Sequence, residues 1–127
     1  MHIAKKEEKM DKGYKKLIVW KRADDFAYLI YAETKKFPKD ELYGIISQIR
    51  RSVLSIPTNI AEGMGRQNKN EIKQFLNIAL GSLAETEYLL EFSLRLKYLD
   101  KAIYDNLERK RQEVGRLLWG LHRSFMK

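Results

Sequence analysis

Apolar residues recur every three or four positions along four long segments of the 127-residue chain, and this period constrains its fold most strongly. Such spacing places the apolar side chains on one face of an α-helix. The sequence shows no alternation of apolar and polar residues of the kind that a half-buried β-strand requires. The sequence therefore predicts an all-α protein.

Breaks between the four segments predict where each helix begins and ends. The first helix should stop at Phe37, because the residue before a proline is pushed out of the α region. Asn68 and Asp100 are good N-caps for the third and fourth helices, since their side chains can accept from the first free N–H groups. The expected helices cover approximately residues 19–36, 41–64, 69–97 and 101–125.

Four long helices joined by short turns favour one architecture, an up-and-down antiparallel four-helix bundle. A chain of 127 residues is long enough to form one domain with its own core. We assign residues 14–127 to this bundle. Residues 1–13 are charged and lack an apolar period, which predicts a flexible, disordered N-terminal tail.

The stretch "SIPTNIAEGMGR", residues 55–66, contains one of only two prolines. Apolar residues keep their helical spacing on both sides of Pro57, so the second helix is expected to continue through it with a bend. Gly63 and Gly65 then follow, and their permissive backbone is expected to end the helix and allow a sharp turn.

The formal net charge is +8, which permits binding to a polyanion but is equally compatible with a merely well-solvated surface. Clustering of the basic residues favours the first interpretation. They gather in the last helix and around the second and third. The candidate nucleic-acid contacts are Arg50, Arg51, Arg66, Lys69, Arg109, Lys110, Arg111, Arg116 and Arg123.

The sequence lacks the residues that several kinds of catalytic, metal or phosphate site require. The chain has no cysteine and two histidines, His2 and His122, and Trp119 stands where a Glu-x-x-His metal motif would need glutamate. It also lacks a nucleophile elbow and a phosphate-binding loop. We therefore expect no catalytic residue, no metal site and no cofactor.

The N-terminus shows no signal peptide, and no apolar run could span a bilayer. The expected location is the cytoplasm, without membrane contact.

Asn59 and Glu62 lie one helical turn apart beside the apolar stripe of the second helix. Half-buried polar groups need hydrogen-bond partners, so we expect both to bond across helices. The alternative is a small-ligand site that Asn59 and Glu62 form together with Arg50.

A lone bundle needs one apolar stripe on each helix, yet this chain has apolar and aromatic residues to spare. Exposed aromatic side chains can stack on bases, or they can seal a subunit interface, which is the interpretation we favour. Large exposed apolar patches also favour self-association. The residues off the stripes are Tyr14, Leu29, Tyr43, Ile46, Leu54, Ile78, Leu80, Tyr88, Leu89, Tyr98, Tyr104 and Trp119.

Three stretches carry a family resemblance that extends over residues 14–125. They are "YKKLIVWKRA", "FPKDELYGIISQIRRSVLSIPTNIAEGMGR" and "NEIKQFLNIALGSLAETEYLL". In these stretches the chain resembles the four-helix-bundle proteins that are encoded in intervening sequences of bacterial 23S ribosomal RNA genes.

The resemblance implies a left-handed bundle that assembles as a homo-pentamer. It also implies distant kinship with the accessory variability protein of diversity-generating retroelements, a basic pentameric barrel associated with reverse transcriptase and nucleic acid. It brings no established catalytic or ligand-binding residue. The positions that match the recurrent polar core of the family are Gln48, Arg50, Arg51, Asn59, Glu62 and Glu85.

These observations lead to one expected function and two alternatives. We expect a non-enzymatic, homo-oligomeric module that binds RNA, DNA or a nucleoprotein partner through basic surfaces. A purely structural protein–protein interaction module is the first alternative. A binder of a small ligand, with a polar site between helices, is the second.

Overall fold

The computed structural model describes residues 13–126, and in this range it consists of helices and turns without a β-strand. Residues 1–12, which make up most of the predicted tail, and Lys127 lie outside the described part. The all-α prediction is confirmed. Two 3-10 turns and four α-helices follow one another as η1 (Gly13–Lys16), α2 (Ile18–Thr34), η2 (Lys39–Glu41), α3 (Ile45–Met64), α4 (Lys69–Arg95) and α5 (Lys101–Ser124).

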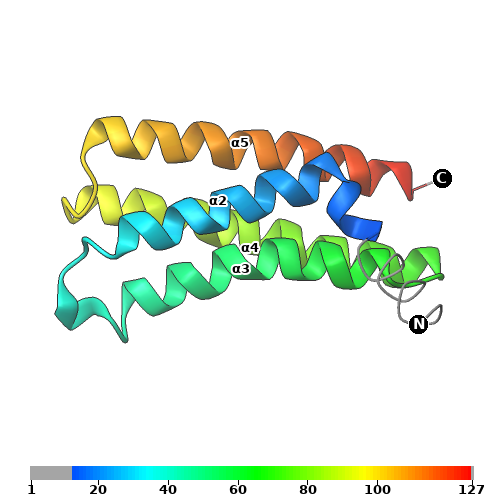
Figure 1. The fold of residues 1–127 in the computed structure, drawn as a ribbon, viewed down its shortest axis with the longest axis horizontal. Helices are drawn as coiled ribbons and strands as arrows, with labels where there is room; N and C mark the ends of the chain where they lie inside the picture. Colours follow the sequence, from blue (N-terminus) through cyan, green and yellow to red (C-terminus); the bar gives the residue numbers. More distant parts are fainter. Residues whose placement is uncertain (1–12, 127) are drawn as a thin grey trace, which may run out of the picture.

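The four helices run up and down in chain order and form an antiparallel bundle (Figure 1). Each helix packs against the one before and the one after it, and α5 returns to pack against α2. Consequently α2 and α4 occupy opposite corners of the bundle, and so do α3 and α5. This arrangement confirms the predicted four-helix bundle.

The core lies along the bundle axis and contains the predicted stripe of α3. Ile49, Val53, Ile56 and Ile60 are fully buried there. The other helices contribute mainly Ala23, Phe26, Ile30, Leu76, Ala79, Leu90, Leu107, Val114 and Leu118.

Two residues that the sequence analysis placed off the stripes, Ile46 and Leu89, are also buried. Each helix faces two neighbours, so its buried face is wider than a single row of side chains.

Helix α3 continues through Pro57, as predicted, and Pro57 itself is buried. The glycines after it act differently from the prediction. No glycine among residues 13–126 has a positive φ, and Gly65 ends α3 in a right-handed conformation with φ −83°. A Cβ atom at Gly63 would lie only 3.0 Å from the Cβ of Phe75 on α4. Gly63 therefore lets α3 approach α4 closely.

Both predicted N-caps are confirmed. The Asn68 side chain accepts from the N–H of Asn70 at 2.8 Å, and the Asp100 side chain accepts from the N–H of Ile103 at 2.8 Å. Helix α4 ends at Arg95, close to the predicted residue 97, but the motif that ends it was not predicted. Lys97 adopts the left-handed region with φ 64°, and the N–H of Tyr98 donates back into the last turn of α4. This pattern is a Schellman motif, in which glycine is usual.

Four hydroxyl groups, two of them on buried residues and two on half-buried ones, join α3 to α4. Ser52 and Thr86 lie 2.8 Å apart, oxygen to oxygen, and the Ser82 hydroxyl donates to that of Ser55 at 2.7 Å. We call these four residues the hydroxyl seam. They make the cross-helix hydrogen bonds that the sequence analysis expected from Asn59 and Glu62.

Candidate nucleic-acid interface

Helix α5 is amphipathic, with a buried face toward the core and a basic face toward solvent. Its outward residues recur at the three-to-four spacing of one helical face and are all exposed. With a rise of about 1.5 Å per residue, this face is about 21 Å long. We call it the α5 stripe, and it consists of Arg109, Gln112, Arg116, Trp119 and Arg123.

An open groove of ≈ 550 Å³ runs between the α5 stripe and α4. Gly115 forms part of its floor, and a Cβ atom there would come within 3.2 Å of Leu83 on α4. The groove is lined by Leu83, Arg111, Gln112, Gly115, Arg116, Trp119 and Arg123. Three of the nine candidate basic residues therefore meet in one place, beside an aromatic ring.

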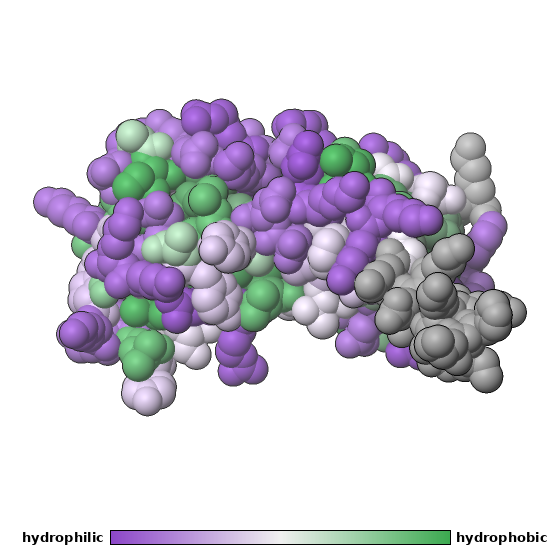
Figure 2. All heavy atoms as spheres, viewed as in Figure 1, coloured by the Kyte–Doolittle hydropathy of each residue, from purple (hydrophilic) through white to green (hydrophobic). Residues whose placement is uncertain are grey.

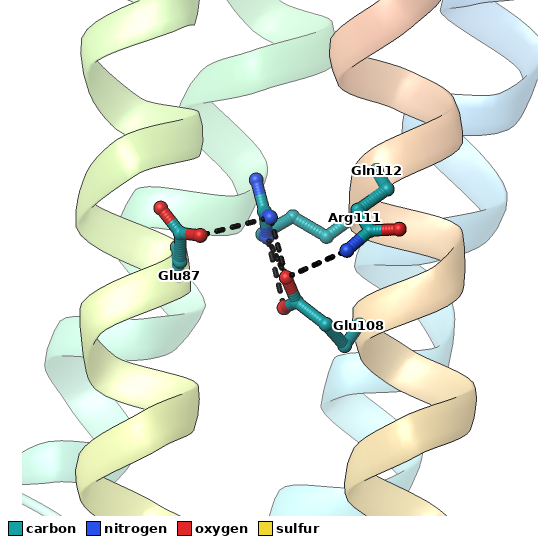
Figure 3. A network of polar contacts seen from close by, with 4 residues as sticks. All are labelled: Glu87, Glu108, Arg111 and Gln112. Carbon is teal, nitrogen blue, oxygen red and sulfur yellow. Dashed lines mark hydrogen bonds and ion pairs between the residues drawn. The ribbon is translucent and has the colours of Figure 1, made fainter.

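Arg111 lines the groove and ties α5 to α4 (Figure 3). Its Nε donates to Glu108 Oε2 at 2.9 Å, and its Nη2 lies 2.9 Å from Glu87 Oε2 on α4. The side chain of Gln112 also donates to Glu108, at 3.5 Å. We call Arg111, Glu108 and Glu87 the charged clamp.

The charged clamp decides which cations remain available to a ligand. The hydrogen bond to Glu108 raises the pKa of Arg111 above its ordinary value. Two carboxylates thus surround this one guanidinium and more than balance its charge. Within residues 13–126, neither Arg116 nor Arg123 forms an ion pair. These two exposed arginines therefore give the groove its positive charge.

The remaining basic candidates are dispersed. Arg109 lies at the start of the α5 stripe, outside the groove, and Lys110 is exposed beside it. Arg51 is exposed on α3, at the opposite corner of the bundle, and Lys69 begins α4. The structure therefore does not unite the nine candidates into one surface.

Two of the candidate arginines are held by contacts within the bundle. Arg50 donates from Nε to Thr34 Oγ1 at 2.9 Å and lies over the ring of Tyr31, so it ties α3 to α2. Arg66 lies over the ring of Phe75, with 4.8 Å between its Cζ and the ring centroid. Arg50 is half-buried in these contacts, whereas Arg66 stays exposed beside the ring of Phe75.

Comparison with known proteins gives the family. The family model described as 23S rRNA-intervening sequence protein matches residues 15–120. The chain belongs to this family. A solved structure from Bacteroides thetaiotaomicron, described as a protein of unknown function from the S23 ribosomal protein family, shares 30% sequence identity. The match has a TM-score of 0.75 and covers 83% of this chain and 98% of that one. No curated protein matches the chain.

The positions of the family's polar core do not form one buried cluster in this member. Gln48, Glu62 and Glu85 are exposed, whereas Asn59 is half-buried. The Asn59 amide donates at 2.7 Å to the carbonyl of Ser55 in its own helix. The expected cross-helix bonds from Asn59 and Glu62 are therefore wrong, because short hydroxyl side chains occupy the contact between α3 and α4. Gln48 and Glu85 line an open polar groove above the hydroxyl seam.

The aromatic residues off the stripes divide into two groups. Tyr98 packs on Phe37 and donates to Glu41 Oε2 at 2.8 Å, which raises its pKa above the usual 10.0. Burial is the main reason why the pKa of Tyr104 is also raised. Tyr43, Tyr88 and Trp119, by contrast, are exposed.

His122 is buried next to Trp119, and neither of its ring nitrogens has a hydrogen-bond partner. The sequence offered no signal for this histidine beyond its place next to Leu121 on the apolar side of the last helix. Between residues 13 and 126 we find no cluster of His, Cys, Asp and Glu that could hold a metal ion. The helices of the same part are too short or too polar to cross a bilayer.

Proposed function

We propose that this protein is a non-enzymatic module of the bacterial cytoplasm that binds nucleic acid through the α5 stripe and works as a homo-oligomer. The observation that carries the proposal is the groove in which Arg116 and Arg123 lie exposed and unpaired beside Trp119. Exposed arginines on one helix face suit phosphate groups, which they contact without reading sequence. The absence of cysteine suits a reducing compartment.

A salt titration of RNA binding tests this proposal. Binding to RNA should weaken linearly, in logarithmic coordinates, as salt rises, because each neutralised phosphate releases counterions. Replacing Arg116 and Arg123 together by glutamine should lower the slope by about one unit for each phosphate that is no longer neutralised. The matched control is Arg51→Gln, an exposed arginine at the opposite corner.

Two outcomes would contradict the proposal. RNA binding that stays undetectable at about 50 mM salt would exclude phosphate contacts altogether. A larger loss from Arg51→Gln than from the double variant would move the interface from α5 to α3.

Self-association is the second part of the proposal, and exposed apolar residues on opposite corners support it. On α2, Tyr28 is 80% exposed, and with Leu54 of α3 it lines an apolar groove of ≈ 380 Å³. On α4, Ile78 and Tyr88 are exposed. Hydrophobic side chains also reach the surface near the connection from α2 to α3 (Figure 2). Two different faces on one chain form a head-to-tail contact, which closes into a ring when the rotation fits.

The family resemblance implies five copies in that ring. Light scattering at micromolar concentration measures the mass directly. A monodisperse species with the mass of one chain would exclude the ring. A Leu54→Asp variant should shift the equilibrium toward the single chain. Ala84 is exposed on α4, and the same shift in Ala84→Asp would make the outward face of α4 the second surface.

A further inference from the structure

Trp119 lies between the two unpaired arginines of the α5 stripe. Arg116 stands three positions before it and Arg123 four positions after it, so the three side chains occupy successive turns of one face. All three line the same groove. The spacing sets an aromatic ring between two cations.

The ring of Trp119 is accessible because of the residue that lies one turn before it in α5. Long side chains on a helix lean back over the preceding turn, and the residue four positions before Trp119 is Gly115, which has no side chain to cover the ring. Trp119 is 49% exposed, and its ring meets that of His122 edge to face, with 5.6 Å between the ring centroids. His122 thus contacts the ring on one side, while about half of the side chain stays exposed.

We propose that Trp119 stacks on an unpaired base of a single-stranded nucleic acid, with Arg116 and Arg123 contacting the phosphates on either side. This inference rests on the proposed function and names the class of nucleic acid. Binding of single strands commonly combines a cationic groove with an aromatic ring on which a base stacks.

A duplex fits this site less well. Its base faces are covered by neighbouring bases, and the ring of Trp119 can reach one only if that base leaves the stack. Unpaired bases in loops, bulges and ends are already free to stack on aromatic side chains. The α5 stripe should therefore prefer single strands, and the preference should depend on Trp119.

Fluorescence and affinity measurements with the full chain test the inference. The chain has two tryptophans, so Trp20→Phe leaves Trp119 as the sole reporter, and Trp119→Phe is the matched control. The probes are an unstructured RNA of about 12 nucleotides, within the usual size of single-strand sites, and the duplex of the same sequence. The single strand should quench Trp119 emission in the first variant, whereas Trp20 emission in the second should change little.

Affinity gives the second readout. Trp119→Ala should weaken single-strand binding by between about five- and 150-fold and leave the salt slope unchanged, since the ring neutralises no phosphate. Trp119→Phe should retain much of the affinity, because it keeps an aromatic ring. Circular dichroism and the melting temperature show that each variant is folded.

Each alternative outcome overturns a different statement. Equal affinity for single strand and duplex, unaffected by Trp119→Ala, would exclude the stacking site and leave the proposed phosphate contacts in place. Failure of both probes to bind at low salt would exclude the proposed function itself. A shift of Trp119 emission with protein concentration alone, together with a lower mass for Trp119→Ala, would assign the ring to a contact between copies.

Discussion

Helix α4 packs against α3 on one side and against α5 on the other, and the two contacts differ in kind. The contact with α3 is close and neutral, with Gly63 against Phe75 and the hydroxyl seam between the helices. The contact with α5 carries the charged clamp and leaves an open groove beside it.

The difference separates a contact that joins two helices from one that carries the proposed binding site. The hydroxyl groups of the α3–α4 contact are already paired with one another, although three of them also line an open polar groove at its surface. The α4–α5 contact carries its ion pairs beside a groove that is lined by arginines and Trp119. The α4–α5 side therefore keeps unpaired cations at the surface, while the α3–α4 side holds the two helices in register.

The largest loss of stability is expected when Arg111, the cation of the charged clamp, is replaced by an uncharged residue. Arg111→Met leaves Glu108, which is 17% exposed, and Glu87, 42% exposed, without their common partner. We expect a loss of about 2 kcal/mol in the free energy of unfolding, less than a fully buried pair would give because solvent screens Glu87. Urea denaturation measures it.

The double variant Arg111→Met with Glu108→Gln is the control and should recover much of the loss. The deficit of the single variant should also shrink as ionic strength rises, because salt screens the two carboxylates from each other. A deficit that is the same at all salt concentrations would mean that poorer packing, and not charge, explains it.

The next largest effect is expected at the close contact between α3 and α4. Gly63→Ala would set a Cβ atom against Phe75 Cβ, an atom fixed to its backbone, so we expect a loss of about 1 to 2 kcal/mol. Gly81→Ala is the matched control, because a Cβ atom there meets nothing within 4 Å. It should raise stability by up to about 1 kcal/mol through helix propensity alone. Equal effects in thermal unfolding would contradict the close approach.

The hydroxyl seam should show a smaller effect that depends on both partners. Ser52 and Thr86 bond each other, and they also bond the carbonyls of Ile49 and Ser82, so two hydroxyl protons serve three contacts. Ser52→Ala and Thr86→Val should each lower stability by about 1 kcal/mol. The double variant should lose less than the sum, and neither single loss should vary with salt. Strict additivity in urea denaturation would show that the two hydroxyls do not interact.

The smallest effects on the free energy of unfolding are expected in the two turns that flank α4. Lys97 adopts the left-handed region, whereas Gly65 does not, so the glycine stands in the turn that does not need it. Lys97→Gly should raise the free energy of unfolding by about 0.5 kcal/mol. Gly65→Ala should change it by no more than about 0.5 kcal/mol. A loss above about 1 kcal/mol in Gly65→Ala would mean that this turn needs glycine after all.

The sequence predicts most of the fold because the signals of helices are local. Apolar spacing marks each helix, and the caps Asn68 and Asp100 act on N–H groups two or three residues away. The role of Gly63 was not predictable in this way, since it depends on how near Phe75 comes from another helix. The same holds for Lys97, a residue that turn preferences would not select.

The candidate site was predicted only in part, for a related physical reason. Charge patterning identified Arg111, Arg116 and Arg123 as equals, but the register of α4 against α5 brings Glu87 to Arg111 alone. A sequence pattern does not reveal which cation will be neutralised by a neighbouring helix. The groove beside Trp119 likewise arises from Gly115 and Leu83 meeting across two helices.

The helices pack mainly against their neighbours in the chain, and this affects how quickly the protein folds. Three of the four helix contacts join helices that follow one another in the chain, and only the contact of α2 with α5 spans most of its length. Helical bundles with such short sequence separations between contacting residues fold in microseconds to milliseconds. Subunit association takes longer and depends on concentration. For the proposed homo-oligomer, each chain is thus expected to complete its own fold first, and assembly should follow as a distinct second-order phase.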